Sequence, residues 1–229
     1  MDKYSIPVSI VIAGLFVAGA VLLSNFYSPG KGDDLANISD AVEGEEENTM
    51  YLNALPVSDS DHILGDKDAK VKVVTYADME CPYCMSFEDT MRTAVADYSG
   101  QVAWVYRHFP LDFHESAMPA AIASECLADL EGGEKFWDFM GKFKSDMTES
   151  GSADVKKIAA SLGANATEFA ECYDSGKFSE KIEGNYNDGI AAGLQGTPYS
   201  VIFADGAPVG TIDGAYPIED VKAAIDPYL

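Results

Sequence analysis

The chain has 229 residues, of which 38 are acidic and 15 are basic, so its formal net charge is −23. This charge argues against nucleic acid as a partner, because phosphate binding needs Lys and Arg. It also opposes attraction to anionic lipid head groups, so any contact with a membrane must come from an apolar segment. The length suits one sizeable domain with appendages.

Residues 1–26 contain an apolar run from Ile6 to Leu23. As a helix this run is roughly 27 Å long, close to the thickness of a bilayer core, so we predict a transmembrane anchor. A cleaved signal sequence is the alternative, because Ala18-Gly19-Ala20 resembles a cleavage site. Since Lys3 and Lys31 nearly balance, the chemistry of the domain sets the expected orientation, with a cytoplasmic N-terminus.

Residues 27–58 are poor in apolar residues and rich in acidic ones, as in the run from Glu43 to Glu47. Such a segment buries too little apolar surface to fold, so we predict an acidic disordered linker. A flexible chain of about 30 residues spans roughly 30 Å, which would hold a domain away from a membrane. The folded domain is predicted to occupy residues 59–229.

The domain is expected to begin with a strand, a helix and a second strand. Val71–Tyr76 and Val102–Tyr106 are rich in β-branched and aromatic residues, which favours strands. Between them, apolar residues recur at helical spacing from Phe87 to Tyr98. This order predicts a βαβ unit with a parallel pair of strands.

Two cysteines, Cys81 and Cys84, lie where the first strand gives way to the helix. Free backbone N–H groups and the helix dipole favour an anion there, and can lower a cysteine pKa from about 8.5 to roughly 3.5–7.5. This favours dithiol redox chemistry, in which one thiolate attacks and a second thiol resolves the mixed disulfide. We expect Cys81 to be the exposed nucleophile and Cys84 the resolving thiol, with Pro82 and Tyr83 as the active-site dipeptide.

Metal binding is the other use of this cysteine spacing. Zinc sites usually pair two short-spaced cysteine motifs, whereas Cys126 and Cys172 form no second motif. The three histidines offer no ligand pair at helical spacing, so we predict neither a metal nor another cofactor. For His108 and His114 we expect structural roles, and for Arg107 a local ion pair.

An all-helical block is predicted to follow, at about 115–194. Apolar residues recur there at helical spacing in five segments, with Ser152 as one expected cap. The chain then returns to strands at 199–203 and 210–212, joined by a turn-rich connection over 204–208, before a last short helix. The pattern predicts an α/β domain with an inserted helical block.

Four motifs in this chain resemble those of DsbA-like members of the thioredoxin superfamily. They are Asp78-Met79-Glu80-Cys81-Pro82-Tyr83-Cys84, Tyr106-Arg107-His108-Phe109-Pro110-Leu111, Glu134-Lys135-Phe136-Trp137 and Gln195-Gly196-Thr197-Pro198. The resemblance spans nearly everything from about Asp61 to Leu229. It implies a thioredoxin-like fold, with a central mixed sheet flanked by helices and a helical insertion, and protein-disulfide oxidoreductase activity.

The resemblance also implies roles for residues outside the cysteine motif. Pro198 would be a cis-proline facing the active-site cysteines, and Thr197 would offer backbone hydrogen bonds to substrate. Related proteins with this helical block often carry a structural disulfide, which here would join Cys126 and Cys172. Two buried free thiols are the alternative, since Cys is among the most buried residue types.

The chain departs from the family pattern at two places. Strongly oxidising members carry His between their cysteines, whereas this chain has Pro82 and Tyr83. Many members of the superfamily have a buried acid six positions before the first cysteine, whereas this chain has Thr75. We therefore expect a thiolate less stabilised, and a potential less oxidising, than in the strongest oxidants.

These expectations combine into one function. A membrane-anchored domain outside the cytoplasm, or a secreted one if the N-terminal segment is cleaved, would introduce disulfides into cysteine-containing client proteins. A membrane redox partner, DsbB-like or VKOR-like, would reoxidise the cysteine pair. The alternatives are an isomerase or reductase of the same fold, and a non-enzymatic metal carrier or client-binding module.

Overall fold

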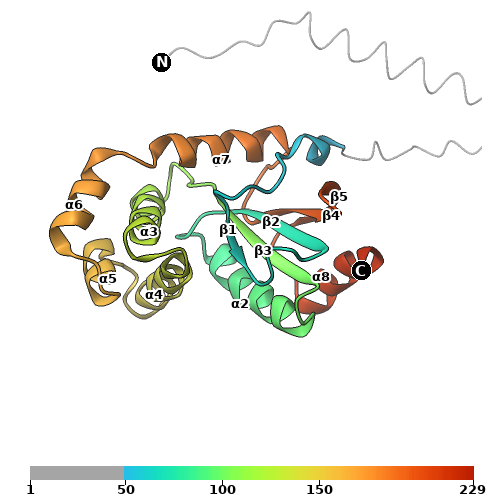
Figure 1. Cartoon of the computed structure of the whole chain (residues 1–229), viewed down its shortest axis with the longest axis horizontal. Helices are drawn as coiled ribbons and strands as arrows, with labels where there is room; N and C mark the ends of the chain where they lie inside the picture. Colours follow the sequence, from blue (N-terminus) through green and yellow to red (C-terminus); the bar gives the residue numbers. More distant parts are fainter. Residues whose placement is uncertain (1–48) are drawn as a thin grey trace, which may run out of the picture. The chain divides into compact units, whose positions relative to one another are not determined.

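A computed structural model describes residues 49–229 of the chain (Figure 1). The predicted anchor and residues 27–48 of the predicted linker lie outside these residues. Within the described part, no helix is long and apolar enough to cross a membrane.

Residues 49–58, which were expected to belong to the disordered linker, are instead packed against the domain. They include the short 3-10 helix η1 (Met50–Asn53), followed by Leu55, whose backbone N–H donates to Asp188 at 2.9 Å. Ala54 is buried, with Tyr51 and Val57 packed beside it. These few apolar residues find their packing partners only in the folded domain. The composition of residues 49–58 alone therefore does not predict that this segment is ordered.

A five-stranded mixed sheet forms the centre of the domain, with the strand order β1-β3-β2-β4-β5. The strands are β1 (His62–Leu64), β2 (Val71–Ala77), β3 (Val102–His108), β4 (Tyr199–Ala204) and β5 (Ala207–Asp213). The predicted parallel pair is confirmed as β2 and β3, while the other pairings are antiparallel. Strand β1 was not predicted, since three residues are too few to show an alternating pattern.

The connection between β4 and β5 is shorter than the predicted 204–208. It consists of Asp205 and Gly206 alone, with φ angles of 49° and 82°. A two-residue hairpin turn with positive φ at both positions suits the right-handed twist of paired strands, and Asp-Gly is a favoured pair for it. The prediction was wrong because the Asp-Gly signal was read as part of a longer loop.

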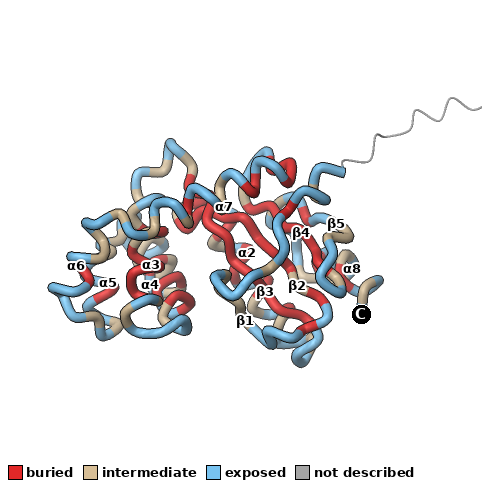
Figure 2. Tube along the Cα trace, turned by 45° about the horizontal axis from the view of Figure 1, so that its top comes forward, coloured by how far each residue is buried: buried red, intermediate tan, exposed pale blue. Residues whose placement is uncertain are grey.

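Helices cover both faces of the sheet. Helix α2 (Pro82–Asp97) and helix α8 (Ile218–Ile225) pack together on one face, and α7 (Ser179–Ala191) crosses β2 and β3 on the other beside η1 (Figure 1). The central strands are therefore buried for most of their length (Figure 2). The chain ends in a 3-10 helix, η2 (Asp226–Tyr228).

The predicted helical block lies between β3 and β4 and packs at one side of the sheet (Figure 1). Besides α7, it contains α3 (Ala117–Glu131), α4 (Glu134–Ser150), α5 (Val155–Ser161) and α6 (Ala166–Ser175). The cap of α5 is Asp154, not the predicted Ser152, because the Asp154 carboxylate accepts from the N–H groups of Lys156 and Lys157.

Candidate active site

The two cysteines lie at the C-terminal end of β2, where α2 begins. Cys81 is the N-cap residue of α2, Pro82 is its first helical residue, and Cys84 lies in the first turn. Proline is favoured at this helical position because its missing N–H would have no partner inside the helix. Cys81 and Cys84 are both free thiols in this structure.

Both cysteine side chains are largely covered. Cys81 retains 5% of its possible exposure and Cys84 retains 8%, so the expectation of an exposed nucleophile is wrong for this conformation. The cover includes Thr197, whose carbonyl oxygen accepts a hydrogen bond from the Cys81 thiol at 3.7 Å. Tyr83, by contrast, is 70% exposed and marks the surface next to the thiols.

The pKa values of the two thiols move in opposite directions. The hydrogen bond from the Cys84 thiol is the largest effect that lowers the pKa of Cys81, and with backbone N–H groups of α2 it outweighs burial, giving a pKa of about 5. Burial raises the pKa of the Cys84 thiol well above its ordinary value. Cys81 is therefore the thiol that loses its proton first, while Cys84 stays protonated.

The Thr197-Pro198 peptide bond is cis, and this segment lies against Cys81 immediately before β4. The carbonyl of Pro198 accepts from the N–H of Gly214, which ties the segment to the end of β5. The Thr197 hydroxyl oxygen is buried without a hydrogen-bond partner among the described residues. The fold thus places Thr197 and Pro198 beside Cys81.

A buried carboxylate, Asp78, fixes the loop that leads into Cys81. It accepts hydrogen bonds from the N–H groups of Glu80 and Leu111 and from Nδ1 of His114, at 2.7–2.8 Å. Sequence reasoning missed this role of Asp78, although its position directly after a strand and just before the cysteine motif was a usable signal. His114, expected to be structural, holds this loop in place.

Thr75 lies six positions before Cys81, where the resemblance led us to look for an acid. It is fully buried, and its hydroxyl oxygen lies 2.8 Å from that of Ser200 and accepts from the indole N–H of Trp104 at 2.9 Å. A hydroxyl does not ionise near neutral pH, so position 75 carries no carboxylate and no other ionised group.

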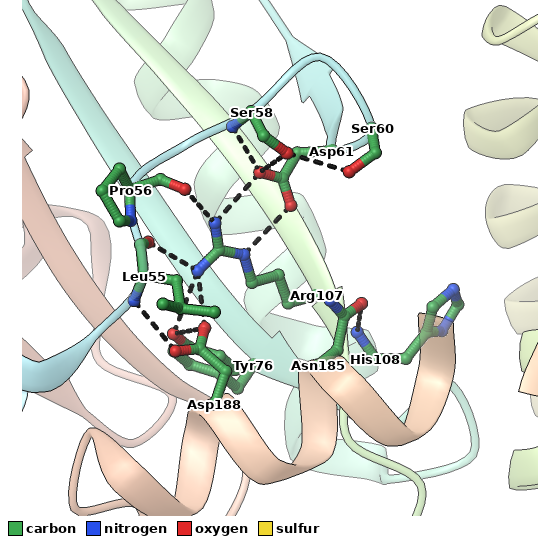
Figure 3. Close-up of polar contacts among 10 residues, drawn as sticks. All are labelled: Leu55, Pro56, Ser58, Ser60, Asp61, Tyr76, Arg107, His108, Asn185 and Asp188. Atoms are coloured by element: carbon green, nitrogen blue, oxygen red, sulfur yellow. Dashed lines mark hydrogen bonds and ion pairs between the residues drawn. The ribbon is translucent and has the colours of Figure 1, made fainter. Parts of the chain in front are cut away.

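Arg107 was expected to make one local ion pair, but it makes two, and both partners are distant in the sequence (Figure 3). Its guanidinium binds Asp61 through two nitrogens at 3.0 Å and Asp188 at 2.6 Å. It also donates to the carbonyls of Leu55 and Pro56. This buried cluster attaches the segment before β1 to β3 and α7.

His108 has a different set of contacts from its neighbour Arg107. Its Nε2 lies 3.0 Å from a carboxylate oxygen of Glu125, which also contacts His62 and Lys181. Burial lowers the pKa of His108. No group of three or more potential ligands in residues 49–229 could hold a metal ion.

Comparisons with known proteins agree with this architecture. A family model described as thioredoxin matches residues 58–227. The Na(+)/H(+) antiporter NhaA 3 of Salinispora tropica is 32% identical over 186 residues, which cover 81% of this chain and 27% of the antiporter. The chain thus spans about a quarter of the length of the curated relatives that it matches.

Two solved structures share the fold. DsbA2 of Pseudomonas aeruginosa aligns with a TM-score of 0.64 and 23% identity, covering 76% of this chain and 97% of that one. The thiol-disulfide exchange protein α-DsbA2 of Wolbachia pipientis aligns with a TM-score of 0.61 and 19% identity, covering 73% and 86%. The predicted DsbA-like thioredoxin fold is confirmed.

Proposed function

This chain belongs to the thioredoxin family, and we propose that it is a thiol–disulfide oxidoreductase that introduces disulfides into client proteins outside the cytoplasm. The proposal rests mainly on the two thiols, whose pKa values are shifted in opposite directions. The pKa of Cys81 is lowered to about 5, whereas Cys84 beside it is buried and protonated. Thr197 and Pro198 supply the surface on which an extended client segment would lie.

The reaction follows from these two environments. A client thiolate attacks the Cys81 sulfur of the Cys81–Cys84 disulfide, and the electron pair of the broken bond goes to Cys84, which takes up a proton. A second client thiolate then attacks the client sulfur of the mixed disulfide and releases Cys81 as a thiolate. The client loses two electrons. A low-pKa thiol leaves readily, so the Cys81 environment favours this direction.

Two features support an oxidising compartment. Cys126 of α3 and Cys172 of α6 form a disulfide in the structure, and such bonds persist outside the reducing cytosol. The apolar residues 6–23 would tether the domain to a membrane, with the acidic residues that follow as a spacer. A DsbB-like or VKOR-like membrane protein linked to quinone would accept the two electrons and restore the disulfide.

Catalysed oxidation of a reduced model protein tests this proposal. Wild-type protein with an oxidised Cys81–Cys84 pair should form disulfides in the client, and Cys81→Ala should be inactive. Cys84→Ala supplied as the mixed disulfide of Cys81 with glutathione should release glutathione and accumulate a client joined to Cys81. A wild-type protein that exchanges no disulfide with the client would refute the proposal.

The reduction potential of the cysteine pair tests the direction of electron flow. A value near about −120 mV indicates an oxidant, whereas one near about −270 mV favours the reductase alternative.

A further inference from the structure

Strand β1 (His62–Leu64) lies at an edge of the sheet. It pairs with β3 alone, so its other side has no strand partner within residues 49–229. All three of its residues keep part of their surface exposed. An edge strand of this kind offers backbone N–H and C=O groups to which an extended chain can pair as a further strand.

A groove of about 740 Å³ lies along this strand, and we call it the β1 groove. Strand β1 lines it with Ile63 and Leu64, and the start of α4 lines it with Trp137. The ring of Phe136 stacks on the ring of His62 with the centroids 3.7 Å apart, which fixes the start of α4 beside the start of β1. The two walls of the groove are therefore held in place by packing.

Carboxylates gather where β1 and α4 begin. Asp59 lies just before β1, Glu134 is the first residue of α4, and both are exposed and line the groove. Neither of them takes part in an ion pair among the described residues. Asp138, one turn further along α4, has only Lys135 as a partner, in a pair that is open to solvent. This end of the groove therefore attracts cations.

The cations of the groove leave this attraction in place. Arg92 already donates to Glu88 at 2.8 Å and to the carbonyl of Trp137 at 3.2 Å. Lys67 follows β1, so it lies beyond the other end of the strand. The groove thus fits an extended polypeptide with Lys or Arg beside the start of β1, and it disfavours a second copy of this chain, whose net charge is −23.

The start of β1 lies at the same end of the sheet as the cysteines. His62 pairs with Tyr106 near the end of β3, and β3 runs parallel to β2, which leads into Cys81. Only β3 separates β1 from β2, so these two strands lie roughly 10 Å apart. About four residues of an extended chain cover this distance.

From this placement we propose that the β1 groove is a second binding site for client proteins, and that it takes an extended segment with Lys or Arg about four or more residues from the reacting cysteine. The inference rests on the proposed function. The segment pairs with β1 as an added strand, and its cationic side chains contact Asp59 and Glu134. A client held there presents its cysteine to Cys81 at a raised effective concentration.

Binding of a peptide without cysteine tests the groove apart from redox chemistry. The probe is a fluorescent peptide of about eight residues that alternates Lys and Val, and a peptide that alternates Glu and Val is its control. Fluorescence anisotropy with the full chain in a neutral detergent should show binding of the Lys peptide only. N-methylation of its backbone should weaken binding by about 10-fold, because it removes the donors that pair with β1. Equal binding of the methylated peptide would rule out strand addition.

Charge reversal in the protein tests the site itself. Asp59→Lys/Glu134→Lys should weaken binding of the Lys peptide by about 10-fold, because two exposed charge contacts become repulsive. The matched control is Glu168→Lys/Glu171→Lys, which makes the same change in net charge at two exposed positions of α6 and should bind like wild type. Equal affinities of the two double variants would mean that net charge alone attracts the peptide, and would overturn the site.

Peptide binding and client oxidation together separate this site from the proposed function. If wild-type protein oxidises a reduced client but binds the Lys peptide no better than the Glu peptide, the site is overturned and the proposed function stands. If wild-type protein exchanges no disulfide, the proposed function is wrong whatever the peptide does. A dithiol peptide with Lys residues about six positions from its cysteines should be oxidised with a KM about 10-fold lower than one with Glu there, and equal KM values would overturn the role in client binding.

Discussion

At the scale of single residues, Cys81 and Cys84 have the same chemistry and different surroundings. One hydrogen bond runs from Cys84 to Cys81, so it stabilises the Cys81 thiolate and the protonated form of Cys84 at the same time. A pKa of about 5 lies above the value of about 3.5 found in the strongest oxidant. This agrees in direction with the weaker stabilisation expected from Pro82 and Tyr83.

The pH dependence of Cys81 alkylation gives the first prediction. Because the pKa of Cys81 is about 5 in the folded wild-type protein, its alkylation rate should fall as the pH drops, with a midpoint near 5. In Cys84→Ala the midpoint should also lie below the ordinary value of about 8.5. Loss of the Cys84 hydrogen bond places the variant's midpoint above the wild-type one. Iodoacetamide with mass detection measures both, and a wild-type midpoint near 8.5 would contradict the structure.

The same pKa sets a stability change in the reduced protein. A thiol whose pKa is lower in the folded state than in the unfolded chain stabilises the folded state fully above about pH 8.5. This contribution is lost as the pH falls toward 5. In urea unfolding, the free energy of unfolding of reduced wild-type protein should therefore decrease as the pH falls from about 8.5 toward 5. Cys81→Ala should lack this part of the pH dependence.

At the scale of elements, the buried Arg107 cluster joins three separate segments. Arg107→Ala should lower the free energy of unfolding by about 3–5 kcal/mol, because Asp61 and Asp188 would remain buried without their partner. Lys135→Ala is the matched control, since its pair with Asp138 is exposed and should contribute no more than about 1 kcal/mol. Equal losses in urea unfolding of the two variants would show that the cluster does not hold the segments.

The disulfide between α3 and α6 gives a second prediction at this scale. Replacing both Cys126 and Cys172 by Ser should lower the free energy of unfolding by roughly 4 kcal/mol, because the unfolded chain regains the freedom of a 46-residue loop. Wild-type protein under reducing conditions is the control and should unfold like the variant. A stability equal to that of the oxidised wild type would contradict the prediction.

The parts of the fold that could be predicted are those with a local signal. The strand–helix–strand unit around Cys81 follows from side-chain periodicity. The parallel pairing of β2 and β3 follows from the helical crossover between them, which returns the chain to the same end of the sheet. Strand β1 and residues 49–58 could not be predicted, because their order depends on β3, Arg107 and α7. Long-range partners of this kind leave no local pattern.

The site shows the same division. The cysteine motif and Thr197-Pro198 were identifiable because a resemblance connects two segments that are far apart in the sequence. The burial of Cys81 was not, since it depends on how closely Thr197 packs against it.

At the scale of the whole molecule, the net charge and the apolar N-terminal run have opposite effects on binding to a membrane. The net charge of −23 opposes binding to anionic lipid, whereas the apolar run at 6–23 favours insertion into a bilayer. Because insertion depends on apolar contact, we expect the full chain to stay with membranes in high salt and alkaline carbonate, and to be released only by detergent.

A chain that begins at Tyr27 is the control for this prediction and should be found in the supernatant under every condition. N-terminal sequencing of the full chain separates the two possible uses of the apolar run. An intact N-terminus on the membrane-bound protein supports an anchor, whereas a mature chain that begins after Ala20 and is recovered in the supernatant would mean that the run is a cleaved signal. Release of an uncleaved chain by salt alone would contradict apolar insertion, because salt weakens only electrostatic contacts.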